Sequence, residues 1–113
     1  MSQKQTQFAK LLNSKGLKFE EEVRELPGTP DIFFRKEKLA VFFHGCFWHN
    51  HSCKEKPTNP ITASQRVAQS INDKAQQKEL LNMGIKYMII WECDYDLDSE
   101  AQAQKVLDRL HFS

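Results

Sequence analysis

Hydrophobic residues near the start of the chain follow two spacings, first that of a helix and then that of a strand. Phe8, Leu11 and Leu12 would share one face of a helix over residues 3–14. A β-rich strand is predicted next, over residues 17–23. We therefore expect the chain to enter a sheet from an amphipathic helix.

Two further β-rich runs follow the turn at residues 26–30, which contains Pro and Gly. They cover residues 31–35 and 39–43, and the charged tip at residues 36–38 between them is typical of a hairpin. From residue 44 to 61 the pattern breaks into a long loop that contains two prolines. Most of the unusual chemistry of the chain falls in this loop.

The second half of the chain predicts a helix, a strand and a final helix. The capping-box sequence at residues 62–65 begins a helix that ends at Gly84. Residues 85–91 form an apolar run of strand length, suited to the middle of a sheet. A second capping box at residues 99–102 precedes the last helix. This order predicts an α/β fold, a mixed β-sheet flanked by helices, in a single domain over residues 1–113.

Composition is that of a globular chain that does not cross a membrane. Charged residues make up 27% and hydrophobic residues 40% of the sequence. No apolar stretch approaches the ~20 residues of a membrane span. Because the N-terminus also lacks the apolar core of a signal peptide, we expect a cytoplasmic protein with no membrane partner. We also expect it to be a monomer.

The formal net charge is only +1, but the charges are segregated along the chain. Residues 1–18 carry four lysines and no acid, whereas residues 92–100 carry five acids and no base. Such a chain can present one basic face to DNA phosphates. Ordinary solvated faces explain the same pattern, so charge leaves both interpretations open.

All three cysteines can join one histidine in a metal site made of Cys46, His51, Cys53 and Cys93. Three thiolates and one imidazole complete a tetrahedral structural zinc site with no open position for catalysis. Such a zinc would hold the long loop, which has no core of its own. The odd cysteine count and the expected compartment argue against a disulfide framework. The alternative is a set of separate buried thiols with a histidine nearby by coincidence.

Asp31, His44 and His49 are candidates for phosphodiester hydrolysis. Asp31 opens one strand of the predicted hairpin and His44 follows the other, so the hairpin can bring them together. A carboxylate can hold Mg²⁺, which stabilises charge on a phosphate, and a histidine can move a proton to or from the reacting oxygens. A turn-capping aspartate and further zinc-ligating histidines explain the same residues equally well.

Phe47 and Trp48 form an adjacent aromatic pair inside the polar loop. In a DNA-binding protein such a pair can wedge between base steps, where stacking repays the cost of unstacking. The alternative is that both rings cover the zinc site as a small local core. The residues alone indicate a domain whose long loop is stabilised by a bound metal, and they leave its activity open.

Three segments together resemble the signature of the very short patch repair (Vsr) endonucleases. They are residues 26–31 (LPGTPD), 41–53 (VFFHGCFWHNHSC) and 89–93 (IIWEC). Those enzymes nick DNA beside T·G mismatches and have the restriction-endonuclease-like fold, of PD-(D/E)XK type. The resemblance implies a strand-nicking endonuclease that acts on double-stranded DNA, including mismatched DNA, with catalytic Mg²⁺ and structural Zn²⁺.

The resemblance also implies roles for single residues. Asp31 resembles the family's magnesium-binding aspartate, and Phe43 stands where the family offers a backbone carbonyl to Mg²⁺. His44 and His49 are similar to its two active-site histidines, although which one is the base stays open. The remaining matches are the four zinc ligands Cys46, His51, Cys53 and Cys93, and the DNA-inserting pair Phe47 and Trp48.

The sequence departs from the family pattern in four places. Gln5 replaces a glutamate that helps to order metal-bound water, and Phe43 replaces a threonine. We expect the N-terminal arm to be essentially absent, and a third intercalating aromatic near residue 62 is missing. Two other interpretations therefore stay open: a catalytically weakened DNA-binding descendant, and a nuclease of restriction or of a mobile element.

Overall fold

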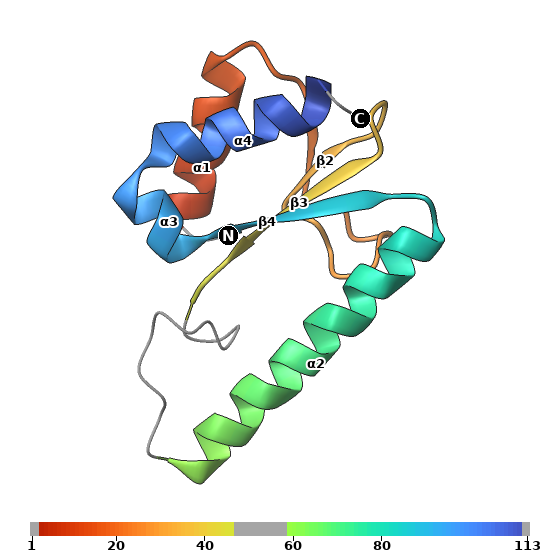
Figure 1. The fold of residues 1–113 in the computed structure, drawn as a ribbon, viewed down its shortest axis with the longest axis vertical. Coiled ribbons are helices and arrows are strands. Elements are labelled where there is room, and N and C mark those ends of the chain that lie inside the picture. The colour runs from red at the N-terminus through yellow and green to blue at the C-terminus, as the bar shows by residue number, and fades with distance from the viewer. Residues whose placement is uncertain (1–2, 47–58, 112–113) are drawn as a thin grey trace.

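The computed structural model describes residues 3–46 and 59–111. Its elements, in chain order, are α1 (Gln3–Ser14), β1 (Glu20–Glu21), β2 (Ile32–Phe34), β3 (Leu39–His44), α2 (Pro60–Asn82), β4 (Lys86–Trp91), α3 (Glu92–Leu97) and α4 (Ser99–His111). Figure 1 shows the sheet between two layers, with α1, α3 and α4 on one side and α2 on the other. The predicted mixed sheet flanked by helices is confirmed.

The sheet has the order β1-β2-β3-β4. The first two pairs are antiparallel, with Ile32 opposite Val41 in the predicted hairpin, whereas β3 and β4 are parallel. Parallel strands need a long connection, and α2 is part of the one between β3 and β4. The parallel pairing places the C-terminal residues of β3 and β4 side by side, with His44 opposite Trp91.

Alternation along the strands creates two apolar cores, one on each face of the sheet. Ile32 and Val41 face α1 and α4, and Phe33 and Ala40 face α2. The buried members of the first core are Phe8, Ala9, Leu12, Ile32, Phe34, Leu39, Val41, Met88, Ile90, Ala103 and Val106. Those of the second are Val23, Phe33, Ala40, Phe42, Leu80 and Ile85. None of the helices in the described ranges is both long and apolar enough to cross a membrane.

Two of the strands differ from the prediction. The strand expected over residues 17–23 is only Glu20–Glu21. It ends there because Glu22 has a left-handed backbone (φ 49°) that a strand cannot continue through. β4 lies at an edge of the described sheet and not in its middle. Its apolar sequence has another cause, since helices cover both of its faces: Met88 belongs to one core and Tyr87 packs against the other.

The long helix α2 begins before the predicted capping box at residues 62–65. Asn59 caps it instead, with its side chain accepting from the Ile61 N–H at 2.9 Å, and Pro60 occupies the first turn. Gly84, with φ of 79°, ends the helix as predicted.

The C-terminal part contains one helix that the sequence did not predict, the short α3 (Glu92–Leu97). The cap of α4 is Asp98, whose carboxylate accepts from the Ala101 N–H at 3.0 Å. The predicted capping box at residues 99–102 is therefore wrong by one residue, and the Gln102 side chain donates to the Asp98 carbonyl at 3.3 Å.

Candidate active site

Asp31 and His44 lie at the same end of the sheet. Asp31 directly precedes β2, His44 ends β3, and these two strands are antiparallel. Both residues line a polar cavity of about 220 Å³. The rest of its lining comes from the turn before β2, from β3 and from one face of α2: Gly28, Thr29, Phe42, Phe43, Gln69, Asp73 and Gln76. The structure thus brings together two of the three predicted catalytic residues.

The Asp31 carboxylate is held from two directions. Gln5 on α1 donates from Nε2 to Oδ1 at 2.6 Å, and the backbone N–H of Phe43 donates to Oδ2 at 2.7 Å. Short hydrogen bonds to an ionised carboxylate are among the stronger ones in proteins, and two of them fix its plane. A carboxylate has about four lone-pair positions, so it can accept hydrogen bonds and bind a cation at the same time.

The imidazole of His44 is buried, with 6% of the residue exposed, and is packed between aromatic rings. Its centroid lies 5.8 Å from that of Phe42 and 5.3 Å from that of Trp91, with the Trp91 ring nearly perpendicular to it. This packing fixes the imidazole at the cavity wall. A group that moves a proton at one atom of a substrate needs such a fixed position.

Helix α2 adds three polar residues that the sequence did not single out. Gln69, Asp73 and Gln76 line the cavity, and Gln69 donates from Nε2 to Asp73 Oδ1 at 2.9 Å. Asp73 is a second carboxylate in the cavity that Asp31 lines. No motif marks these residues, and the usable signal is their spacing, which places them on the same helix face as the buried Leu80.

Gly28 keeps the cavity wall open, because a side chain there would meet its neighbours. It has φ of +79°, and an added Cβ would lie 3.0 Å from Phe42 Cε1 and 3.1 Å from Gln76 Oε1. Gly28→Ala is expected to lower the free energy of unfolding by about 2–4 kcal/mol, because backbone strain and overpacking add. Denaturant titration measures this loss.

Gly84→Ala is the matched control for that substitution. Gly84 also has φ of +79°, but nothing lies within 4 Å of the added Cβ. In the control, only backbone strain should lower the free energy of unfolding, by about 1–2 kcal/mol. Equal losses in the two variants would show that the turn does not pack tightly against Phe42 and Gln76.

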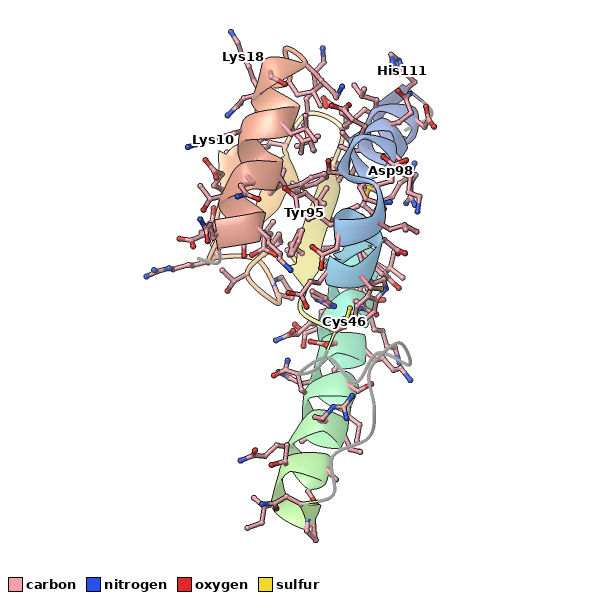
Figure 2. The ribbon with its side chains drawn as sticks, turned by 90° about the vertical axis from the view of Figure 1, so that its left-hand side faces the viewer. Lys10, Lys18, Cys46, Tyr95, Asp98 and His111 are labelled. Atoms are coloured by element: carbon pink, nitrogen blue, oxygen red, sulfur yellow. The ribbon has the colours of Figure 1, made fainter. Side chains whose placement is uncertain are left out.

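Cys46 and Cys93 come together at the ends of the two parallel strands. Cys46 lies just beyond the end of β3 (Figure 2) and is fully buried, and Cys93 is half-buried in the first turn of α3. The Cys93 backbone N–H donates to Cys46 Sγ at 3.3 Å, and neither thiol forms a disulfide. A backbone N–H in this position can also donate to a thiolate, the form of cysteine that binds metal. Two of the four predicted zinc ligands are therefore neighbours.

The other predicted site residues lie outside the described ranges. They are the second catalytic histidine, two zinc ligands and the aromatic pair: His49, His51, Cys53, Phe47 and Trp48. Within residues 3–46 and 59–111, no group of three or more His, Cys, Asp or Glu side chains could hold a metal ion. Only two of the four proposed zinc ligands fall in those ranges.

Comparison with known proteins identifies the family of this chain. A family model described as DNA mismatch endonuclease Vsr matches residues 2–55. The type II nicking enzyme V.XorIIP of Xanthomonas oryzae pv. oryzae is 35% identical over 104 residues, which cover 87% of this chain and 76% of that protein. V.NmeAIP, a type II nicking enzyme of Neisseria meningitidis, is 31% identical over 105 residues, 89% of this chain and 74% of that protein.

A third relative is the DNA mismatch endonuclease Vsr of Escherichia coli. It is 32% identical over 90 residues, which cover 76% of this chain and 58% of that protein. The V.XorIIP match spans most of both chains, and the family model covers the segment that contains Asp31 and His44. The chain therefore belongs to the Vsr family of DNA mismatch endonucleases.

Proposed function

We propose that this chain, a DNA endonuclease by its family, nicks double-stranded DNA in a Mg²⁺-dependent reaction that uses Asp31, His44 and His49. The observation that carries the proposal is the polar cavity lined by Asp31 and His44, with the Asp31 carboxylate fixed by two donors. We also propose the restriction-endonuclease-like fold. A site at the end of a mixed sheet between helix layers supports it.

The cavity offers the oxygen-rich surroundings that Mg²⁺ prefers. We assign the Asp31 carboxylate and the Phe43 backbone carbonyl as protein ligands, with water and the substrate phosphate in the remaining positions. Gln5, where the family usually has a glutamate, supports Asp31 as a hydrogen-bond donor and adds no negative charge. When bound, Mg²⁺ would supply positive charge that offsets the charge developing on the phosphate.

The two histidines divide the proton transfers in this proposal. An imidazole titrates near neutral pH, so it can accept a proton from the attacking water or donate one to the leaving oxygen. His44 is fixed at the cavity wall, which supports a role beside the phosphate or the leaving oxygen. His49 is assigned as the base or water-orienting residue on the family resemblance.

A structural zinc on Cys46, His51, Cys53 and Cys93 completes the proposed site. The burial of Cys46 and its hydrogen bond from the Cys93 N–H support it. A closed shell of three cysteines and one histidine leaves no position for substrate, so this zinc would only hold structure. It would tie the loop that carries His49 to the strand end beside His44.

The proposed substrate is duplex DNA, with T·G mismatches preferred. The relatives include a protein named DNA mismatch endonuclease and two named nicking enzymes, which supports this class. Phe47 and Trp48 are assigned to insertion between bases. Unstacking is cheaper at a mismatch, so inserted rings would favour such sites.

Plasmid nicking tests the proposed activity. With Mg²⁺, the purified protein should convert supercoiled plasmid that carries a T·G mismatch into nicked circles and not into linear DNA. Mg²⁺ is omitted in the control and not chelated, so that zinc stays in place. Linear product would contradict strand nicking. Retained DNA binding without cleavage would instead favour the catalytically weakened descendant.

A further inference from the structure

The short helix α3 links the paired cysteines to the first turn of α1. Its residue Cys93 donates its N–H to Cys46 Sγ at 3.3 Å. From the same helix, Asp96 and Glu92 accept from Lys4 Nζ at 2.9 and 3.3 Å. The Lys4 contacts join residues that are 88 and 92 positions apart in the sequence.

Tyr95 provides a second link between α3 and α1. Its hydroxyl donates to Gln7 Oε1 at 3.2 Å, and its ring contacts Phe8 and Phe43 edge-on, with centroids 5.9 and 5.4 Å apart. Phe8 and Phe43 also contact one another, at 6.2 Å. Figure 2 shows Tyr95 between α1 and the helices at the C-terminal end.

The two donors to Asp31 described above, Gln5 and the Phe43 N–H, are therefore supported from α3. Gln5 lies in the helical turn that contains Lys4, Gln7 and Phe8, and Lys4 and Gln7 are held by α3 side chains. The backbone N–H of Phe43 is the other donor, and its ring packs on Tyr95.

We propose that Lys4, through its pairing with α3, and Tyr95 on α3 are positioning residues that hold Gln5 and Phe43 against Asp31 and so set the affinity of Asp31 for Mg²⁺. The inference rests on the proposed function, because it concerns the same metal carboxylate. The inference also extends the proposed function, because it couples the end of the sheet that carries the two cysteines to the catalytic carboxylate.

The Lys4 ion pairs are exposed, with 40% of its side chain accessible, and contribute little to overall stability. The proposed role of these ion pairs is to hold α1 in position, because small displacements of a catalytic group change the reaction rate strongly. The pKa of Lys4 is raised above its ordinary value, first by the hydrogen bond to Asp96. Lys4 is therefore charged at neutral pH, and its own charge would be lost only as the pH rises above that raised pKa.

The test measures divalent-cation affinity directly, with Mn²⁺ as the probe and electron paramagnetic resonance as the readout. Lys4→Met removes the charge but keeps the stem, and Tyr95→Phe keeps the ring but removes the bond to Gln7. We expect each to weaken Mn²⁺ binding by about 3- to 10-fold, within the usual range of couplings between sites. Melting temperatures should stay close to that of the unchanged protein.

Lys15→Met is the matched control. Lys15 joins the far end of α1 to Glu100 on α4 by an ion pair of 2.8 Å, away from Gln5. It should leave Mn²⁺ affinity unchanged. Combining Lys4→Glu with Asp96→Lys and Glu92→Gln restores the shorter pairing in reverse without repulsion from Glu92, and should recover most of the affinity that Lys4→Met loses.

The outcomes separate this inference from the proposed function. If Asp31→Asn weakens Mn²⁺ binding but Lys4→Met and Tyr95→Phe do not, only the positioning role is overturned. Equal losses in Lys4→Met and Lys15→Met would also overturn it, since any ion pair on α1 would then suffice. If the unchanged protein binds no Mn²⁺, or Asp31→Asn binds it equally well, the metal carboxylate itself is wrong and both proposals fall.

Discussion

Replacing Asp31 by asparagine is expected to abolish Mg²⁺-dependent nicking while the fold survives. The rate should fall by about 10³-fold or more, because a neutral amide holds Mg²⁺ poorly and the metal's charge on the phosphate is worth several kcal/mol. The new amide oxygen can still accept from the Phe43 N–H, and the Gln5 amide can turn over to accept from the new N–H. Nicking rates and melting temperatures measure the two effects.

Asp108→Asn is the control for this change. Asp108 also accepts from a glutamine side chain, that of Gln104, at 2.9 Å, but on the exposed part of α4. The nicking rate of the Asp108→Asn variant should stay within about twofold of that of the unchanged protein, because most surface substitutions have small effects. Parental activity in Asp31→Asn would show that Asp31 is only a turn residue.

Cys93→Ser is expected to have the largest effect on stability. Serine is not among the residues that bind zinc in structural sites, so the metal should be lost. The free energy of unfolding should then fall by more than about 3 kcal/mol, and the melting temperature by about 10 °C or more. The substitution keeps the backbone N–H that donates to Cys46, so the loss would come from the thiolate and not from that hydrogen bond.

Chelation provides the control for the zinc assignment. The unchanged protein, stripped of zinc, should melt at the temperature of Cys93→Ser, and that variant should not melt lower when chelator is added. Elemental analysis gives the zinc content of both proteins. A zinc content and melting temperature unaffected by Cys93→Ser would contradict the assignment.

The hairpin was predictable because two β-rich runs, the Pro/Gly turn before them and the charged tip between them all specify it locally. Its antiparallel register then follows, and with it the meeting of Asp31 and His44 in one cavity. The neighbouring strand was overpredicted. Its composition favours β structure over residues 17–23, but tertiary pairing with β2 extends only to Glu21 before the backbone turns at Glu22.

The contribution of α2 to the cavity was not predictable from a single sequence. Gln69, Asp73 and Gln76 resemble solvent-facing polar residues, and their inward position depends on how α2 crosses the sheet. The hydrogen bond from Gln5 to Asp31 has the same origin, because α1 and the strand that follows Asp31 meet only in the folded chain. The roles of the residues between 47 and 58 remain predictions from the family motif.

Strand-resolved cleavage of a T·G-mismatched duplex tests the central claim most directly. The duplex carries a different label on each strand, and a fully paired duplex of the same sequence is the comparison. We predict a single cut in one strand of the mismatched duplex, dependent on Mg²⁺, lost in Asp31→Asn and slower on the paired duplex. Cleavage of both strands, or cleavage that persists in Asp31→Asn, would contradict the account.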